Sequence, residues 1–134
     1  MEASNLALSE QLLCEGIQKI YTQQLEQQLI EISCYIFDRI LVLILEGVIT
    51  PPEHFLNRNN DVRLVSRVRG ELDRIIQPKI KDLIEKTINV TVTDFLCDTA
   101  IDTDRTGAIV IFEFPSRTAS LKTSDDGTHN RKAL

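Results

Sequence analysis

An apolar run over residues 41–49 leads directly into the segment Thr50-Pro51-Pro52-Glu53. The run is too short to cross a bilayer, and it is typical of a strand buried on both faces. It is interrupted at Gly47, after which Thr50 can cap a helix and Glu53 can complete a capping box. Pro51 then falls where a missing N–H costs nothing. A central strand that gives way to a helix within a few residues predicts a small mixed α/β domain.

The rest of the chain carries five further patterns. Apolar residues recur with helical spacing over residues 9–27 and again over 64–88. Alternating or apolar segments predict strands over 30–37, 90–97 and 108–114. The alternation slips near Asp94 in the second of these segments, which favours a β-bulge. Asp38-Arg39 separates the first strand from the apolar run and predicts a tight hairpin.

The expected fold class is α+β, with the order α-β-β-α-β-β. Four strands can form one antiparallel sheet with two helices on one face, and residues 40–45 would then occupy a central strand. The other sheet face would be more apolar than a monomer normally tolerates, which predicts a homodimer surface. The residues expected on that surface are Tyr35, Phe37, Leu41 and Leu43.

At 134 residues the chain is expected to form one domain over residues 1–115. Residues 116–134 are mostly Ser, Thr, Lys, Asp, Asn and Gly, a composition that predicts a disordered polar tail. Pro78 lies within the second helical pattern and should kink the helix there.

Charge and cysteine content exclude several classes of partner. The net charge of −5 argues against nucleic acid and against electrostatic docking on anionic lipid. The three cysteines have no C-x-x-C spacing, which fits a reducing compartment and no disulfide framework. The beginning of the chain has no signal-peptide pattern, and no apolar stretch is long enough to insert directly into a membrane. The expected localisation is cytoplasmic.

The sharpest motif is an acidic segment over residues 98–107, followed by Glu113. Counted from Asp102, its acidic residues and Gly107 have a spacing close to that of an EF-hand calcium loop. Pro115 forbids an exiting helix, and Glu113 on a strand would project away from the loop. The favoured interpretation is a hairpin loop with Asp and Gly as turn formers. Weak cation binding stays open for Asp98, Asp102 and Asp104.

A second candidate is a basic stripe on the long helix formed by Arg67, Arg74 and Lys81, which could bind an anion or an acidic partner. Opposite charges four residues away favour a solvated, salt-bridged face instead. No Ser-His-Asp, Cys-His or H-E-x-x-H arrangement and no Gly-rich phosphate loop can be assembled from the sequence. We therefore expect no enzymatic activity, no catalytic residues and no cofactor.

Three features follow one another along the chain. They are the segment Gly47-Val48-Ile49-Thr50-Pro51-Pro52-Glu53, the helix containing Arg74-Ile75-Ile76-Gln77-Pro78, and the strands around Val92–Asp98 and Ile109–Phe112. This order resembles the MpsC-like family over roughly residues 9–115. That family comprises small bacterial proteins named after the third component of a sodium-translocating system that generates a membrane potential.

The resemblance implies a cytoplasmic accessory or regulatory module of a membrane system that moves cations or inorganic carbon. It brings no established catalytic residues. Its expected partners are a second copy of the chain and a membrane transport complex. The alternative function is a small-molecule or ion sensor that uses the acidic segment 98–107 or the basic stripe.

Overall fold

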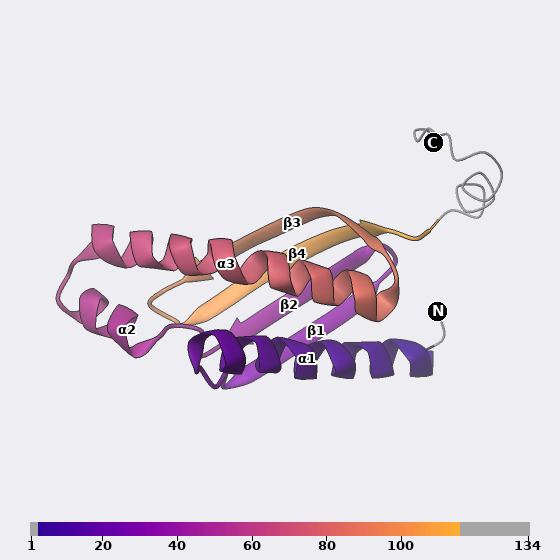
Figure 1. Cartoon of the computed structure of the whole chain (residues 1–134), viewed down its shortest axis with the longest axis horizontal. Coiled ribbons are helices and arrows are strands. Elements are labelled where there is room, and N and C mark those ends of the chain that lie inside the picture. Colours follow the sequence, from indigo (N-terminus) through magenta and orange to yellow (C-terminus); the bar gives the residue numbers. More distant parts are fainter. Residues whose placement is uncertain (1–2, 116–134) are drawn as a thin grey trace.

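The computed structural model describes residues 3–115, which form three helices and four strands (Figure 1). The expected tail over residues 116–134 lies outside the described residues. In chain order the elements are α1 (Ala3–Leu25), β1 (Glu31–Phe37), β2 (Ile40–Glu46), α2 (Pro51–Arg58), α3 (Val62–Ile88), β3 (Thr91–Ala100) and β4 (Arg105–Glu113).

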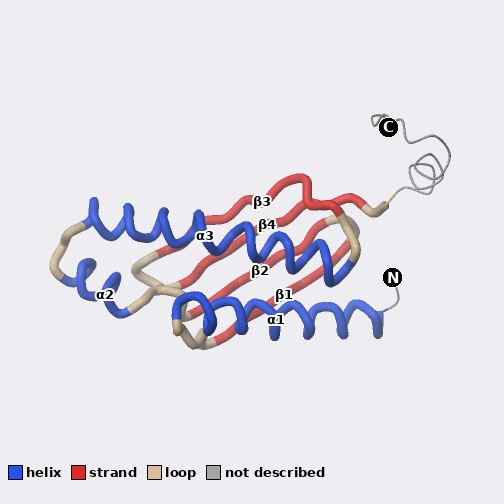
Figure 2. The backbone as a smooth tube through the Cα atoms, in the orientation of Figure 1, coloured by secondary structure: helices blue, strands red, loops and turns tan. Residues whose placement is uncertain are grey.

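The four strands form one sheet in the order β1-β2-β4-β3, and every neighbouring pair is antiparallel. The helices α1 and α3 lie across one face of this sheet, while α2 lies beyond its end (Figure 2). The predicted α+β class, the antiparallel sheet and the central position of β2 are confirmed. The additional helix is α2, which begins after Thr50 and is separated from α3 by residues 59–61.

Local signals fix the ends of several elements. Asp61 caps α3, where its Oδ1 accepts a hydrogen bond from Leu64 N at 3.4 Å. The helix then continues to Ile88 with Pro78 inside it. The two-residue hairpin between β1 and β2 is present, and Asp38 in it adopts a φ of 56°. The predicted bulge is confirmed by a register shift between Val92 and Asp94.

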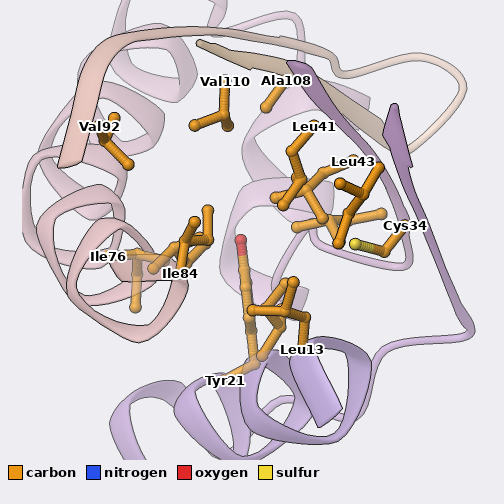
Figure 3. Close-up of a cluster of buried hydrophobic side chains, with 14 of the residues drawn as sticks. Leu13, Tyr21, Cys34, Leu41, Leu43, Ile76, Ile84, Val92, Ala108 and Val110 are labelled. Atoms are coloured by element: carbon orange, nitrogen blue, oxygen red, sulfur yellow. The ribbon is translucent and has the colours of Figure 1, made fainter. Parts of the chain in front are cut away.

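The core lies between the sheet and the two long helices. Leu13 and Tyr21 of α1 face Ile76 and Ile84 of α3, and both pairs approach the sheet from the same side (Figure 3). The largest fully buried side chain is Phe112 of β4. Burying a residue of this kind contributes about 1.5–3 kcal/mol, so a core of this composition needs no disulfide or metal.

Gly47 ends β2 in a conformation that suits only glycine. Its φ is +85°, and a Cβ at this position would lie 2.8 Å from the backbone nitrogen of Ile30. Ile30 N in turn donates a hydrogen bond to Glu46 O at 2.8 Å, so the backbone here cannot move without breaking that bond. The strand exit is therefore built around the missing side chain.

The Gly47→Ala variant should lose about 1–3 kcal/mol of unfolding free energy because it combines an unfavourable φ with a backbone clash. Urea denaturation measures this loss. The matched control is Gly70→Ala on α3, because a Cβ on Gly70 meets nothing within 4 Å. That control should be neutral or stabilising by up to about 1 kcal/mol. Equal stability of the two variants would contradict this account of the strand exit.

Candidate functional site

The acidic loop predicted over residues 98–107 is shorter in the structure. Strand pairing continues to Ala100 and Arg105, so only residues 101–104 form the turn. Asp98 is a strand residue as a result, and its Oδ1 accepts a hydrogen bond from the neighbouring Thr99 N at 2.9 Å. The predicted extent of the loop was wrong because β3 and β4 remain paired up to the four-residue turn.

Asp104 connects this turn to the strand exit after β2. Its Oδ1 accepts a hydrogen bond from Ile49 N at 2.7 Å, and its carbonyl oxygen accepts one from Gly47 N at 3.0 Å. Its Oδ2 lies 3.6 Å from Nε2 of His54 in α2. The geometry gives Asp104 a structural role in holding the two segments together.

Asp102 makes a different contact, in which its Oδ1 accepts a hydrogen bond from Asn57 Nδ2 at 3.4 Å. Within residues 3–115, no three His, Cys, Asp or Glu side chains are grouped so that they could hold a metal ion. Weak cation binding by Asp98, Asp102 and Asp104 therefore stays a prediction from the sequence. The structure does not group these side chains as the ligands of one ion.

Arg67, Arg74 and Lys81 are all exposed on α3. Arg74 Nη2 lies 2.7 Å from Glu71 Oε1. The two residues are about one helical turn apart and form an ion pair on the protein surface. Binding of an anion or acidic partner by this stripe stays a prediction.

Two buried charges, Glu53 and Arg69, form a cluster with the partly exposed Asp73. Glu53 is fully buried and Arg69 is only 5% exposed. Arg69 Nη1 lies 3.3 Å from Glu53 Oε1 and donates to Val48 O at 3.3 Å, while its Nη2 lies 3.2 Å from Asp73 Oδ1. One guanidinium thus connects α3, α2 and the strand exit.

The capping box predicted for Thr50 and Glu53 is present and is continuous with this cluster. Glu53 Oε1 accepts hydrogen bonds from Thr50 N at 3.0 Å and from Thr50 Oγ1 at 2.9 Å. Glu53 Oε2 and Arg69 Nε are buried without a hydrogen-bond partner among the protein atoms. Desolvation raises the pKa of the Asp73 carboxyl, and the Arg69 charge opposes this rise.

The burial of Arg69 was not predicted, although the sequence carries a signal for it. Arg69 lies on the apolar stripe of α3, four residues after the buried Val65 and seven before the buried Ile76. An arginine at such a position must either break the helix packing or find buried partners. The contacts of Arg69 join α2, α3 and the strand exit, which gives the cluster a structural role.

The cysteines are free thiols in the structure, as the sequence analysis expected. Cys34 is buried, and Cys14 and Cys97 are partly buried. Burial raises the pKa of Cys34 to about 12, with the nearby Cys14 and Glu10 adding to the rise. Burial also raises the pKa of Cys97 to about 11, with Asp73 and Asp98 adding to the rise and Arg69 and Gln77 opposing it. These values favour inert thiols over nucleophiles.

The raised pKa values predict alkaline destabilisation. In the unfolded chain the thiols ionise near 9.0, whereas in the fold they keep their protons to about 11 and 12. Their contribution to stability is therefore fully present below about pH 9 and is lost as the pH rises toward those folded values. The unfolding free energy of the wild type should fall more steeply between about pH 8 and pH 11 than that of the Cys34→Ala/Cys97→Ala variant. Parallel pH profiles from urea denaturation would contradict the assignment.

The sheet surface away from α1 and α3 is not covered by any described element (Figures 1 and 2). Strand pairing arranges its side chains in four rows that run from β1 through β2 and β4 to β3. We call this surface the open face, and its rows are Phe37-Ile40-Ile111-Asp94, Tyr35-Val42-Ile109-Leu96, Ser33-Ile44-Gly107-Asp98 and Glu31-Glu46-Arg105-Ala100.

Two expectations about this surface need correction. Leu41 and Leu43 were expected on it, but both are buried against the helices, and Ile40, Val42 and Ile44 occupy the outer side of β2 instead. Burial of β2 on both faces was also expected, and in the single chain only the inner face is buried. Tyr35 and Phe37 do lie on the open face, as predicted.

Gly107 creates a hollow in the open face because it contributes no side chain between its neighbours. The hollow has a volume of about 650 Å³ and is lined by Val42, Ile44, Leu96, Asp98 and Ile109 together with the backbone of the central strands. Most of the groups that line it are apolar. This arrangement can bind an apolar side chain, and it offers little acid–base chemistry.

The fold and this site define a class: a two-layer α+β domain that has one sheet face packed under helices and one apolar face open. A family model described as Na+-translocating membrane potential-generating system (MpsC) matches residues 7–114. The chain therefore belongs to the MpsC family, which confirms the resemblance seen in the sequence.

No curated protein and no solved structure matches the chain. Within the part that the structure describes, none of the helices combines the length and the apolar character needed to cross a membrane. The family points to a role linked to a sodium-translocating system that generates a membrane potential.

Proposed function

We propose that this chain is a non-enzymatic, cytoplasmic accessory or regulatory protein of a membrane system that translocates sodium ions or inorganic carbon. It acts by protein binding through the open face. Family membership supports the membrane context. The observation that carries the binding role is the open face itself, where three adjacent rows are uncharged on β1, β2 and β4.

The chemistry of the hollow at Gly107 supports binding over catalysis. An active site normally brings several titratable groups together in a pocket. Of the residues that line this hollow, Asp98 and Cys97 are the titratable ones. Burial holds the thiol of Cys97 protonated, with a pKa of about 11, and Asp98 has no base or nucleophile paired with it among the lining residues.

The free state of all three cysteines supports the cytoplasmic localisation, because thiols persist in a reducing compartment. The proposed assembly is a homodimer that associates with a membrane transport complex. The chain contacts the protein part of the membrane complex and not the lipid, since its net charge of −5 repels anionic headgroups.

The test is the sodium-dependent part of the membrane potential, measured with a potential-sensitive dye in cells that contain or lack this chain. Loss of the chain should lower that part of the potential, and expression of the wild type should restore it. Leu43→Asp, which removes the fold, should not restore it, whereas the surface variant Ile75→Glu should. An unchanged sodium-dependent potential in cells without the chain would overturn the accessory role.

A further inference from the structure

The open face has the anatomy of a protein interface. Its first three rows present only uncharged residues on β1, β2 and β4. The acidic side chains of these rows, Asp94 and Asp98, lie on the edge strand β3. Glu31, Glu46 and Arg105 occupy the row at one end. An uncharged centre with a polar rim is the usual composition of a surface that another protein covers.

The size of the face also fits a dimer. Four strands about 4.8 Å apart, with seven paired residues at about 3.4 Å each, cover roughly 450 Å² in projection. The side chains that project from this area make the accessible surface larger still. Monomers rarely expose apolar patches of more than a few hundred Å², and a stable dimer buries about 800 Å² on each partner.

The shape of the open face is self-complementary, with projecting side chains on one side and a hollow on the other. Tyr35 and Phe37 project from the β1 side, and they are 54% and 53% exposed. The hollow at Gly107 lies toward the β3 side of the same face. A twofold axis in the interface, parallel to the strands and between β2 and β4, places β1 of one copy opposite β3 of the other. The Tyr35 side of each copy then faces the hollow of the other copy, so the same contact occurs twice, as a twofold interface requires.

We propose that the open faces of two copies pack against each other, and that Tyr35 of each copy occupies the hollow at Gly107 of the other. This inference rests on the proposed function as a binding module, and it identifies the first partner as a second copy of this chain. The sheets pack face to face about 10 Å apart. The Tyr35 hydroxyl lies on the side of Asp98, which lines the hollow and can accept its hydrogen bond.

The acidic rim favours a second copy over a lipid surface. Asp94 and Asp98 border the uncharged centre along β3, Glu31 and Glu46 border it at one end, and Arg105 is the basic residue in the four rows. Anionic headgroups would meet these two borders with like charge, whereas two protein copies leave the same acids hydrated at the edge of their interface.

The experiment is the solution mass of the full chain by light scattering and sedimentation across micromolar concentrations. The wild type should have twice the chain mass of 15.2 kDa. Ile109→Glu, at the centre of the face, should have the mass of a monomer and still unfold cooperatively. The matched control is Ile75→Glu on α3, since Ile75 and Ile109 are both 47% exposed. This control should remain dimeric.

Two further variants test the hollow. Gly107→Leu places a side chain in it, where a Cβ meets nothing within 4 Å, and Tyr35→Ala removes the group that occupies it. Each should raise the dissociation constant of the dimer by at least about tenfold. Phe55→Ala on α2 is the control for Tyr35→Ala, because Phe55 is an aromatic residue of similar exposure, 58%. It should leave the dissociation constant unchanged.

A monomeric wild type at all concentrations would overturn the inference and assign the open face to a different protein. A dimer that survives Ile109→Glu would overturn it as well, since the interface would lie elsewhere. A dimer that Ile109→Glu dissociates but Gly107→Leu leaves intact would overturn the role of the hollow. The accessory function is measured separately by the membrane potential, so a dimer without an effect on that potential overturns only the proposed function.

Discussion

Replacing Arg69 with leucine should lower the unfolding free energy by about 3–5 kcal/mol, a large share of the 5–15 kcal/mol that holds a typical domain together. The cost arises because Glu53 stays fully buried while losing the cation 3.3 Å from its Oε1. Val48 O also loses its guanidinium donor. Urea denaturation followed by circular dichroism measures the loss.

Two controls separate the buried cluster from arginine in general. Arg74→Leu removes the exposed ion pair with Glu71 and should cost no more than about 1 kcal/mol. Glu53→Leu combined with Arg69→Leu removes both buried charges, so this double variant should be more stable than Arg69→Leu alone, apart from the lost capping box. An Arg69→Leu variant as stable as Arg74→Leu would show that the buried charges do not depend on one another.

The second large effect is expected at Leu43, which is 1% exposed beneath α1 and α3. Leu43→Asp places a carboxylate in the core, where nothing among its apolar neighbours can pair with it. We expect this variant to be unfolded at 25 °C, with no cooperative transition in a thermal melt monitored by circular dichroism.

Ile44 provides the matched control because it is the next residue of the same strand and is 38% exposed on the open face. Ile44→Asp should fold with a cooperative transition, since its carboxylate reaches water in the monomer. The pair of variants tests the orientation of β2 directly. A folded Leu43→Asp together with an unfolded Ile44→Asp would mean that the two faces of the strand have been exchanged.

The strand-to-helix junction shows how far local sequence signals reach. Thr50 and Glu53 form the predicted capping box, and Gly47 ends the strand as expected. These features depend on residues within a few positions of each other, so their patterns can be interpreted without the rest of the fold. The hairpin at Asp38-Arg39 and the bulge before Asp94 were predicted for the same reason.

The acidic turn shows where such signals end. The spacing of Asp102, Asp104 and Gly107 suggested a loop motif, but strand pairing takes Gly107 into β4. The backbone of Ile49, 55 positions before Asp104, then becomes the hydrogen-bond partner of that aspartate. A contact over this distance leaves no periodicity in the sequence, so Asp104 could be recognised as a turn residue but not as a connection.

The sequence by itself determined the α+β class, the order of the elements and the central place of β2, because periodicity, capping and turn residues act locally. Only the tertiary structure decided which side of β2 faces the helices. Every residue from Ile40 to Leu45 is apolar, so the strand carries no alternation from which its inner face could be identified. Register with β1 and β4 buries Leu41 and Leu43 and leaves Ile44 outside, and that choice creates the open face.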